Sequence, residues 1–206
     1  MVRKKSSRRK GPVCLNAGCG SPDNGRLPRF FHDWQQIRAD IDPSMEPDLV
    51  ANIADLSALP DRTVDAVWSA HCVEHLFAHQ VPVALAEFRR VLRETGFACV
   101  IVPDLQAIAH WIATDRLRET IYQSEAGPVT AHDMLWGFGA AIARGKIAMA
   151  HHCGFTPSSF LDCFKEAGFA EIVLRRRSNY LELAALAFRR RANAIQRKTL
   201  MAELEL

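Results

Sequence analysis

The feature that most constrains the fold is a pair of glycines, Gly18 and Gly20, placed directly after a short apolar run. A strand that ends in a Gly-x-Gly turn lets the backbone approach a ligand without interference from side chains. Asp40 lies twenty residues after Gly20, at the end of a second apolar run, where its carboxylate can accept two hydrogen bonds from a ribose diol. The pattern predicts the start of a nucleoside-binding βαβ unit.

The glycine turn differs from the dinucleotide fingerprint, which requires a third glycine three residues after the second. Asp23 occupies that position in this chain. A ligand that contains a ribose but no pyrophosphate therefore fits the turn better than a dinucleotide does.

Apolar runs predict the strands of a doubly wound sheet, because strands buried on both faces are continuously apolar. Apolar residues at helical spacing predict a helix over 82–95, ended by Gly96. The first crossover is expected to be short or irregular, since it contains Pro22, Asn24-Gly25 and Pro28. The five expected parallel strands cover 13–17, 36–41, 49–53, 64–70 and 98–102.

Five ordered segments carry a resemblance to a known family. They read IRADIDP at 37–43, IADLSALP at 53–60, VDAVWSAHCVEHL at 64–76, FRRVL at 88–92 and VIVPDL at 100–105. With the glycine turn, they resemble class I S-adenosylmethionine-dependent methyltransferases of the methyltransferase type 11 family. The resemblance covers roughly residues 13 to 105 and departs from the family pattern at two places. Asn16 stands where an acidic residue is common, and Ser21-Pro22 replaces the third glycine.

The resemblance implies an α/β, Rossmann-like, doubly wound and mostly parallel sheet, closed by antiparallel strands at 171–177 and 182–188. Residues 106–157 form the largest insertion and are expected to lay two or more helices, as a lid, over the carboxyl ends of the strands. A helix is expected over 158–167. The expected domain division is a basic flexible tail at 1–12, the methyltransferase domain at 13–190 and a polar helical tail at 191–206.

The resemblance also implies S-adenosylmethionine as the cofactor. Gly18 and Gly20 would pass close to its methionine portion, and Asp40 would accept hydrogen bonds from the ribose, with Asp42 as a second candidate. Asp55 and the Leu56 backbone would face the adenine. The full expected set of cofactor contacts is Asn16, Ala17, Gly18, Gly20, Asp40, Asp42, Asp55, Leu56, Ser69 and His71.

Methyl transfer places few demands on catalytic side chains, because the sulfonium is already electrophilic and the protein mainly aligns and desolvates the reactants. A general base is needed only where the acceptor must lose a proton. His71, at the end of the strand over 64–70, is the first catalytic candidate. His152, or its neighbour His151, either reaches the acceptor or lies on the surface. Asp104 either orients the acceptor or caps the next helix.

The histidines also bear on metal binding. His71, His75 and His79 are spaced four residues apart, and His151-His152-Cys153 follows later in the chain. We nevertheless expect no metal, because neither a Cys-x-x-Cys nor a His-Glu-x-x-His pattern occurs. The favoured role of His75 is that of a packed structural histidine.

The charge distribution separates two classes of acceptor. The chain carries a formal net charge of +3, but residues 1–10 alone carry +6, so the remainder is mildly acidic at −3. A basic tail can contact nucleic acid through its phosphates. The acidic body, and the absence of an Asn-Pro-Pro-aromatic motif or paired catalytic cysteines, favour a small-molecule acceptor over a nucleic acid.

The sequence therefore predicts a methyltransferase that acts on a small molecule, whose identity and acceptor atom stay open. The alternatives are an RNA methyltransferase and a noncatalytic binding module that retains the fold. No membrane span is expected, because no run of about 18 apolar residues occurs. The basic N-terminus lacks the apolar region of a secretory signal. Six cysteines without Cys-x-x-Cys spacing favour the reducing cytoplasm, and the likeness implies a bacterial protein of open oligomeric state.

Overall fold

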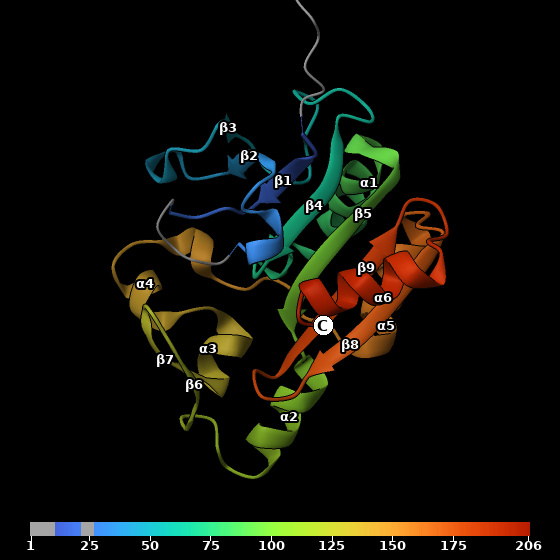
Figure 1. Ribbon diagram of the computed structural model, residues 1–206. Helices are drawn as coiled ribbons and strands as arrows, with labels where there is room; N and C mark the ends of the chain where they lie inside the picture. The colour runs from blue at the N-terminus through green and yellow to red at the C-terminus, as the bar shows by residue number, and fades with distance from the viewer. Residues whose placement is uncertain (1–10, 22–26) are drawn as a thin grey trace, which may run out of the picture.

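A seven-stranded sheet in the order β3-β2-β1-β4-β5-β9-β8 forms the centre of the computed structural model, which describes residues 11–21 and 27–206 (Figure 1). Strand β9 runs antiparallel to both of its neighbours, and the other pairings are parallel. The strands are β1 (Val13–Ala17), β2 (Gln35–Asp40), β3 (Leu49–Val50), β4 (Val64–Ala70), β5 (Leu92–Pro103), β8 (Glu171–Arg177) and β9 (Glu182–Phe188). The predicted α/β fold with a closing antiparallel pair is confirmed.

Helices cover both faces of this sheet, as expected for a doubly wound fold. Alternate side chains of β4 point to opposite faces, so Val67 joins one core and Trp68 the other. Helices α1 (Val81–Val91) and α5 (Pro157–Glu166) pack on the Val67 face. The 3-10 turn at Arg29–Phe31 and helix α6 (Ala194–Glu203) pack on the Trp68 face.

Helix α6 is present where a polar helical tail was expected, but it is not a free tail. Leu200 and Leu204 are buried and belong to the same core as Phe31 and Trp68. The low apolar content of this segment hid the packing, because two leucines four residues apart are enough to anchor one face of a helix. The C-terminal segment therefore closes one face of the sheet.

The connection between α1 and β5 differs from the prediction. Helix α1 ends at Val91, and β5 begins at Leu92 instead of near residue 98, so Gly96 lies inside a strand. Leu92 is buried and pairs with Val64 of β4, which draws the chain into the sheet early. A Cβ atom at Gly96 would lie 2.9 Å from the Asp65 carbonyl oxygen, so the glycine permits a close backbone approach instead of ending the helix.

The segment over 106–157 contains the predicted helices and also a hairpin that the sequence did not predict. Its elements, with the helix that leads into it, are α2 (Leu105–Ala113), β6 (Thr120–Ser124), β7 (Gly127–Thr130), α3 (Ala131–Trp136) and α4 (Gly139–Ala143). Gly127 and Pro128 begin β7. A small core that contains Ile108, Val129 and Met134 holds the segment together.

Two sequence predictions lie largely outside the described residues. They are the basic tail at 1–12 and the irregular part of the first crossover at 22–26. Among the described helices, none combines the length and the apolar character that a membrane crossing needs.

Candidate functional site

The site is built where the strand order reverses, between β1 and β4. Chain connections leave β1 toward β2 and β3, and leave β4 toward β5, so the loops after β1 and β4 diverge and open a crevice. Gly18 and Gly20 follow β1 with positive φ angles of 71° and 59°, a conformation that glycine adopts readily. Asn16 and Ala17 end β1, and Ser69 and His71 lie at the end of β4. The fold thus brings the two predicted halves of the cofactor site together.

Asp40 lies beside the glycine turn, as predicted from its spacing. Its Oδ2 atom accepts a hydrogen bond of 2.8 Å from the Gly20 N–H, and its Oδ1 atom accepts one of 2.9 Å from the Asp42 N–H. The Gly18 and Cys19 N–H groups both donate to the Ala39 carbonyl. Each Asp40 oxygen retains a second lone pair for a diol. The carboxylate therefore fits a ribose while it also braces the turn.

Asp42 and Asp55 both accept hydrogen bonds within their own turns. Asp42 caps the 3-10 turn Pro43–Met45 by accepting from the Ser44 N–H, and Asp55 accepts from the Ser57 N–H at 3.1 Å. These bonds lower the pKa of both carboxyl groups, so both are ionised near neutral pH. Asp55 is exposed and Asp42 is half-buried.

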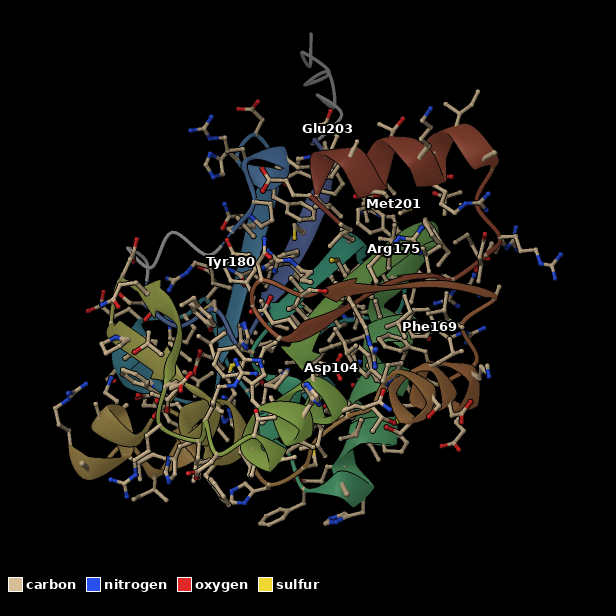
Figure 2. All side chains as sticks on the ribbon, turned by 90° about the horizontal axis from the view of Figure 1, so that it is seen from below. Asp104, Phe169, Arg175, Tyr180, Met201 and Glu203 are labelled. Carbon is tan, nitrogen blue, oxygen red and sulfur yellow. The ribbon has the colours of Figure 1, made fainter. Side chains whose placement is uncertain are left out.

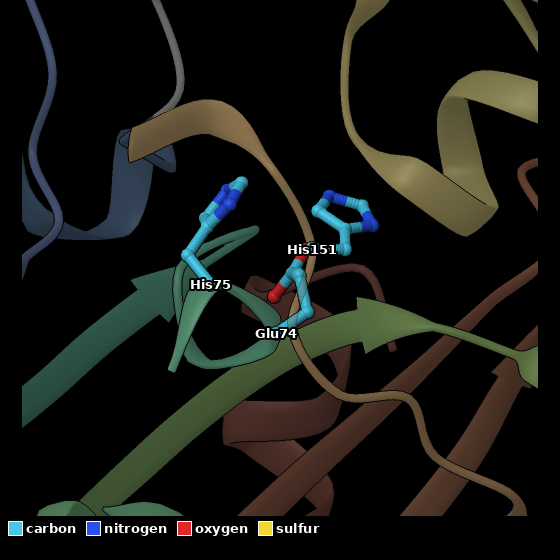
Figure 3. A group of neighbouring side chains, drawn as sticks. All are labelled: Glu74, His75 and His151. Atoms are coloured by element: carbon cyan, nitrogen blue, oxygen red, sulfur yellow. The ribbon is translucent and has the colours of Figure 1, made fainter. Parts of the chain in front are cut away.

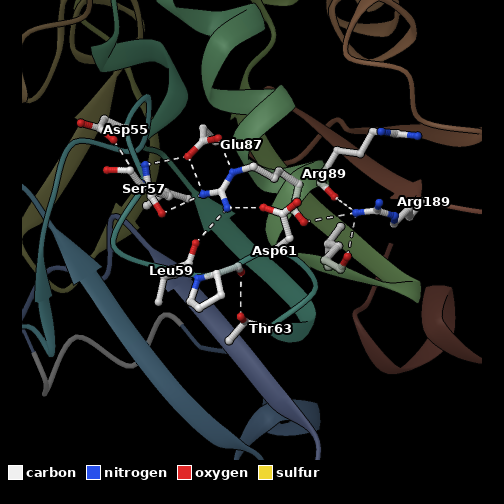
Figure 4. Close-up of polar contacts among 12 residues, drawn as sticks. Asp55, Ser57, Leu59, Asp61, Thr63, Glu87, Arg89 and Arg189 are labelled. Carbon is white, nitrogen blue, oxygen red and sulfur yellow. Dashed lines mark hydrogen bonds and ion pairs between the residues drawn. The ribbon is translucent and has the colours of Figure 1, made fainter.

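The Leu56 backbone, expected to face adenine, is held by side chains of α1. The Leu56 N–H donates to Glu87 Oε2 at 2.9 Å, and its carbonyl accepts from Arg90 at 2.8 Å. The Arg90 guanidinium also donates to the Leu59 carbonyl and to the Asp61 and Glu87 carboxylates (Figure 4). Hydrogen bonding from Arg90 lowers the pKa of Glu87. One arginine thus fixes the whole loop over 55–61.

Replacing Arg90 with alanine is expected to lower the free energy of unfolding by about 2–3 kcal/mol, because several charge-assisted hydrogen bonds are lost at once. Urea denaturation measures this loss. Arg89→Ala is the matched control, since the neighbouring Arg89 makes one hydrogen bond, to the Gly168 carbonyl, from an exposed position. Equal losses in the two variants would contradict a special role for Arg90.

His71 lies between two buried carboxylates. Its Nε2 atom is 2.8 Å from Glu182 Oε1, and its Nδ1 atom is 3.3 Å from Glu74 Oε1. Glu182 also pairs with Arg177 at 2.7 Å. Burial alone would lower the pKa of His71, but hydrogen bonding to Glu182 and Glu74 raises it to about 9. His71 is therefore a cation at neutral pH, which makes it an electrostatic and positioning group and a poor proton acceptor.

A cavity of about 570 Å³ opens between the carboxyl edge of the sheet and the segment over 106–157. Its floor comes from Trp68, Ala70 and Ile101 of the central strands. The remaining walls combine apolar and polar side chains. They include His71, His75, Tyr122, Asp133, Met134, Phe138, His151, Arg177, Tyr180 and Glu182.

The two histidines in this wall are oriented by backbone carbonyls. His75 Nδ1 lies 3.1 Å from the Ala150 oxygen, and His151 Nδ1 lies 2.9 Å from the Met134 oxygen. A carbonyl only accepts, so both Nδ1 atoms carry hydrogen and the Nε2 atoms remain available. Burial lowers the pKa of His151, which favours the neutral ring.

Two catalytic candidates, Asp104 and His152, lie away from the cavity walls, and so does Ser69 of the expected cofactor contacts. Asp104 is buried at the start of α2, where it accepts from the Gln106 and Ala107 N–H groups and pairs with Arg176 at 3.0 Å (Figure 2). His152 is exposed and stacks on Phe77 with ring centroids 4.4 Å apart. Ser69 is fully buried, and its hydroxyl has no hydrogen-bond partner among the described residues. Of the catalytic candidates, only His71 lines the cavity.

Sequence reasoning missed Glu182, Tyr122 and Tyr180 as cavity residues. Glu182 carries a weak signal, because it is the only acidic residue in the apolar run Glu182–Phe188. A charged residue that starts a buried strand needs a partner, which points to a site. The two tyrosines, whose rings lie 5.4 Å apart, carry no such signal because their contact depends on the hairpin.

Comparison with known proteins agrees with this architecture. The family model described as a methyltransferase domain matches residues 15–100. A search of curated protein sequences gave no significant match. The matched residues include the glycine turn and Asp40.

Solved methyltransferases share the fold over most of both chains. A protein from Archaeoglobus fulgidus matches with a TM-score of 0.58 at 14% identity, covering 86% of each chain. A Haloferax volcanii methyltransferase, solved with the Trm112 activator, matches with a TM-score of 0.59 at 14% identity. The match covers 88% of this chain and 84% of the other. Burkholderia thailandensis 1,6-didemethyltoxoflavin-N1-methyltransferase, solved with S-adenosylhomocysteine, matches with a TM-score of 0.53 at 15% identity. The match covers 88% of this chain and 72% of the other.

These similarities show that the chain has the fold of class I S-adenosylmethionine-dependent methyltransferases, with the crevice at the strand reversal that this fold carries. Residues 15–100 match the methyltransferase-domain family.

Proposed function

We propose that the protein transfers a methyl group from S-adenosylmethionine to a small-molecule acceptor bound in the 570 Å³ cavity. The cavity itself supports this proposal most directly. Its volume lies in the range of about 300–1,000 Å³ that is typical of small-molecule sites. It adjoins the carboxyl ends of β4 and β5, beside the crevice where the cofactor would bind.

The segment over 106–157 acts as a lid in this proposal. Tyr122, Met134 and Phe138 supply apolar surface that excludes water, while Asp133 and Tyr180 supply polar groups that orient an acceptor. S-adenosylmethionine supplies an electrophilic methyl group. An acceptor nitrogen or oxygen forms the new bond to carbon while the carbon–sulfur bond breaks and its electron pair remains on sulfur.

The cofactor contacts carried forward are those at the crevice. Asp40 would accept from both ribose hydroxyls, and the turn over 16–20 would face the methionine portion. The Leu56 N–H is already donated to Glu87, so an adenine would meet Asp55 and the loop surface instead. His71 would contribute a positive charge at the edge of the cavity. Asp104 and His152 do not line the cavity, so the proposal gives them no direct contact with the acceptor.

The cavity favours a small molecule over the RNA alternative, because a large polymer would need a broad basic face instead of a recess closed by a lid. The six cysteines, all within the described residues, are free thiols. Free thiols support a reducing compartment such as the cytoplasm.

Isothermal titration with S-adenosylmethionine, S-adenosylhomocysteine and NAD tests the proposed function. Binding of the first two without NAD is the expected result. A folded protein that binds none of them would favour the noncatalytic alternative.

Asp40→Ala is expected to weaken S-adenosylhomocysteine binding by about 1–3 kcal/mol, because a bidentate acceptor of the ribose diol is removed. The same titration measures the loss. Asp42→Ala is the matched control, since that half-buried carboxylate stands two residues further on and caps only its own turn. A larger loss of affinity in the Asp42 variant would indicate that Asp42, and not Asp40, contacts the ribose.

A further inference from the structure

Three side chains from two distant segments converge at the wall of the acceptor cavity. Glu74 and His75 belong to the 3-10 turn Val73–His75 after β4, and His151 lies in the irregular segment over 151–154 that precedes α5. One ligand atom from each side chain lies within 4.8 Å of the others, and Figure 3 shows Glu74 between the two histidines (Figure 3). The backbone keeps the segments together, because the His152 N–H donates to the Glu74 carbonyl at 2.9 Å.

Glu74 is the strongest indication that this cluster binds a ligand. The side chain is only 1% exposed, its one close charged neighbour among the described residues is His71, and Glu74 Oε2 has no hydrogen-bond partner among them. His71 Nδ1 lies 3.3 Å from the other carboxylate oxygen, Glu74 Oε1. A buried carboxylate oxygen without a partner is costly, so a cation on the side away from His71 would stabilise Glu74 further.

The two rings are arranged as metal ligands usually are. Each donates its Nδ1–H to a backbone carbonyl, at 3.1 Å for His75 and 2.9 Å for His151. Such bonds fix the tautomer and leave the Nε2 lone pair for a metal ion. The ring centroids lie 4.8 Å apart in an edge-to-face arrangement, so the rings do not block each other by stacking.

We propose that Glu74, His75 and His151 bind a divalent transition-metal ion, with Zn²⁺ as the favoured ion. Two imidazoles and one carboxylate form a three-ligand set that leaves coordination positions open for a substrate. Zn²⁺ binds such atoms at about 2.0–2.2 Å, which places tetrahedral ligands roughly 3.4 Å apart. Side-chain rotations that move these atoms by about 1 Å would close the site.

The open positions determine the substrate class. His75 and His151 both line the 570 Å³ cavity, so an ion held between them would present its free positions to the acceptor. A metal ion lowers the pKa of a bound hydroxyl and orients its oxygen. This inference rests on the proposed function and narrows it to acceptors with a hydroxyl that can bind the metal, the proton passing to solvent water.

The metal site can be tested without any methyl acceptor. The full chain is treated with a chelator, titrated with ZnCl₂ by calorimetry and analysed for bound metal. Binding of one Zn²⁺ per chain is expected. His151→Ala and Glu74→Gln should each lower the affinity roughly 100-fold or more, because loss of an outer-shell partner alone costs 10–100-fold. His110→Ala, at an exposed histidine of α2, should leave the affinity unchanged.

Cobalt absorption supplies a second readout. It would not depend on His151 if that histidine had only a structural role. Co²⁺ bound by this ligand set should give visible absorption in the wild-type chain, and that absorption should disappear in His151→Ala while far-UV circular dichroism stays constant. A folded wild-type chain that binds no metal would overturn the proposal, as would unchanged affinity in both ligand variants. S-adenosylhomocysteine is titrated into the same sample. Binding of the nucleoside without binding of metal rejects the metal site alone, and the reverse rejects only the proposed function.

Discussion

Glu182→Gln is expected to lower the free energy of unfolding by about 2–4 kcal/mol at pH 7, because removing one member of a buried ion pair leaves the other charges uncompensated. Glu182 is 3% exposed and contacts both His71 and Arg177. The substitution keeps the size of the side chain, so the loss reports charge and hydrogen bonding more than volume. Urea denaturation of chelator-treated protein measures it.

The same cluster predicts how the stability of the chain changes with pH. The pKa of His71 is about 9 in the folded chain, above its ordinary value of 6.5. Its contribution to stability is therefore complete below about pH 6.5 and is lost as the pH rises through 9. The wild-type chain should lose stability over that interval, and Glu182→Gln should show a shallower decline.

Asp162→Asn is the matched control for the loss of a paired carboxylate. Asp162 forms an ion pair with Lys165 at 2.8 Å, but both side chains are more than half exposed. Exposed pairs contribute about 0–1 kcal/mol, so the control should keep the stability and the pH profile of the wild type. A Glu182→Gln variant that behaves like this control would contradict the buried cluster.

The sheet and the cofactor crevice were predictable from sequence because they depend on local patterns. Apolar runs located the central strands, and Asp40 reached the Gly20 turn because neighbouring parallel strands end at the same edge of a sheet. The short β3 and the early start of β5 were not predictable. Their lengths depend on pairing with β2 and β4 instead of on their own composition.

The acceptor side was hidden because its contacts join distant segments. His71 and Glu182 are 111 residues apart, and His75 meets the Ala150 carbonyl across 75 residues. No spacing rule connects such positions in a single sequence. The expectation that no metal binds came from local ligand motifs, whereas the proposed ligands come from a turn after β4 and from the end of the segment over 106–157.

Gly18→Ala is expected to cost about 2–5 kcal/mol of stability and to remove measurable S-adenosylhomocysteine binding. A Cβ atom at Gly18 would lie 2.3 Å from Cys72 Sγ and 2.6 Å from Cys72 Cβ, and the φ angle is 71°. Backbone strain contributes about 1–2 kcal/mol and overpacking about 1–3 kcal/mol. Gly18 lies in the loop after β1 and Cys72 in the loop after β4. The clash between them should therefore push the two sides of the cofactor crevice apart. Thermal unfolding and calorimetric titration measure the two effects.

Two further variants separate the clash from the strain. Gly145 also has a positive φ, of 88°, but a Cβ atom there would meet nothing within 4 Å, so Gly145→Ala should cost only about 1 kcal/mol. Combining Gly18→Ala with Cys72→Gly removes the clashing atoms, and the double-mutant cycle should show a favourable coupling of at least about 1 kcal/mol. If the Gly18 and Gly145 variants lost equal stability and the cycle showed no coupling, backbone strain alone would explain the glycine. That result would contradict the view that close contact between the loops after β1 and β4 maintains the shape of the crevice.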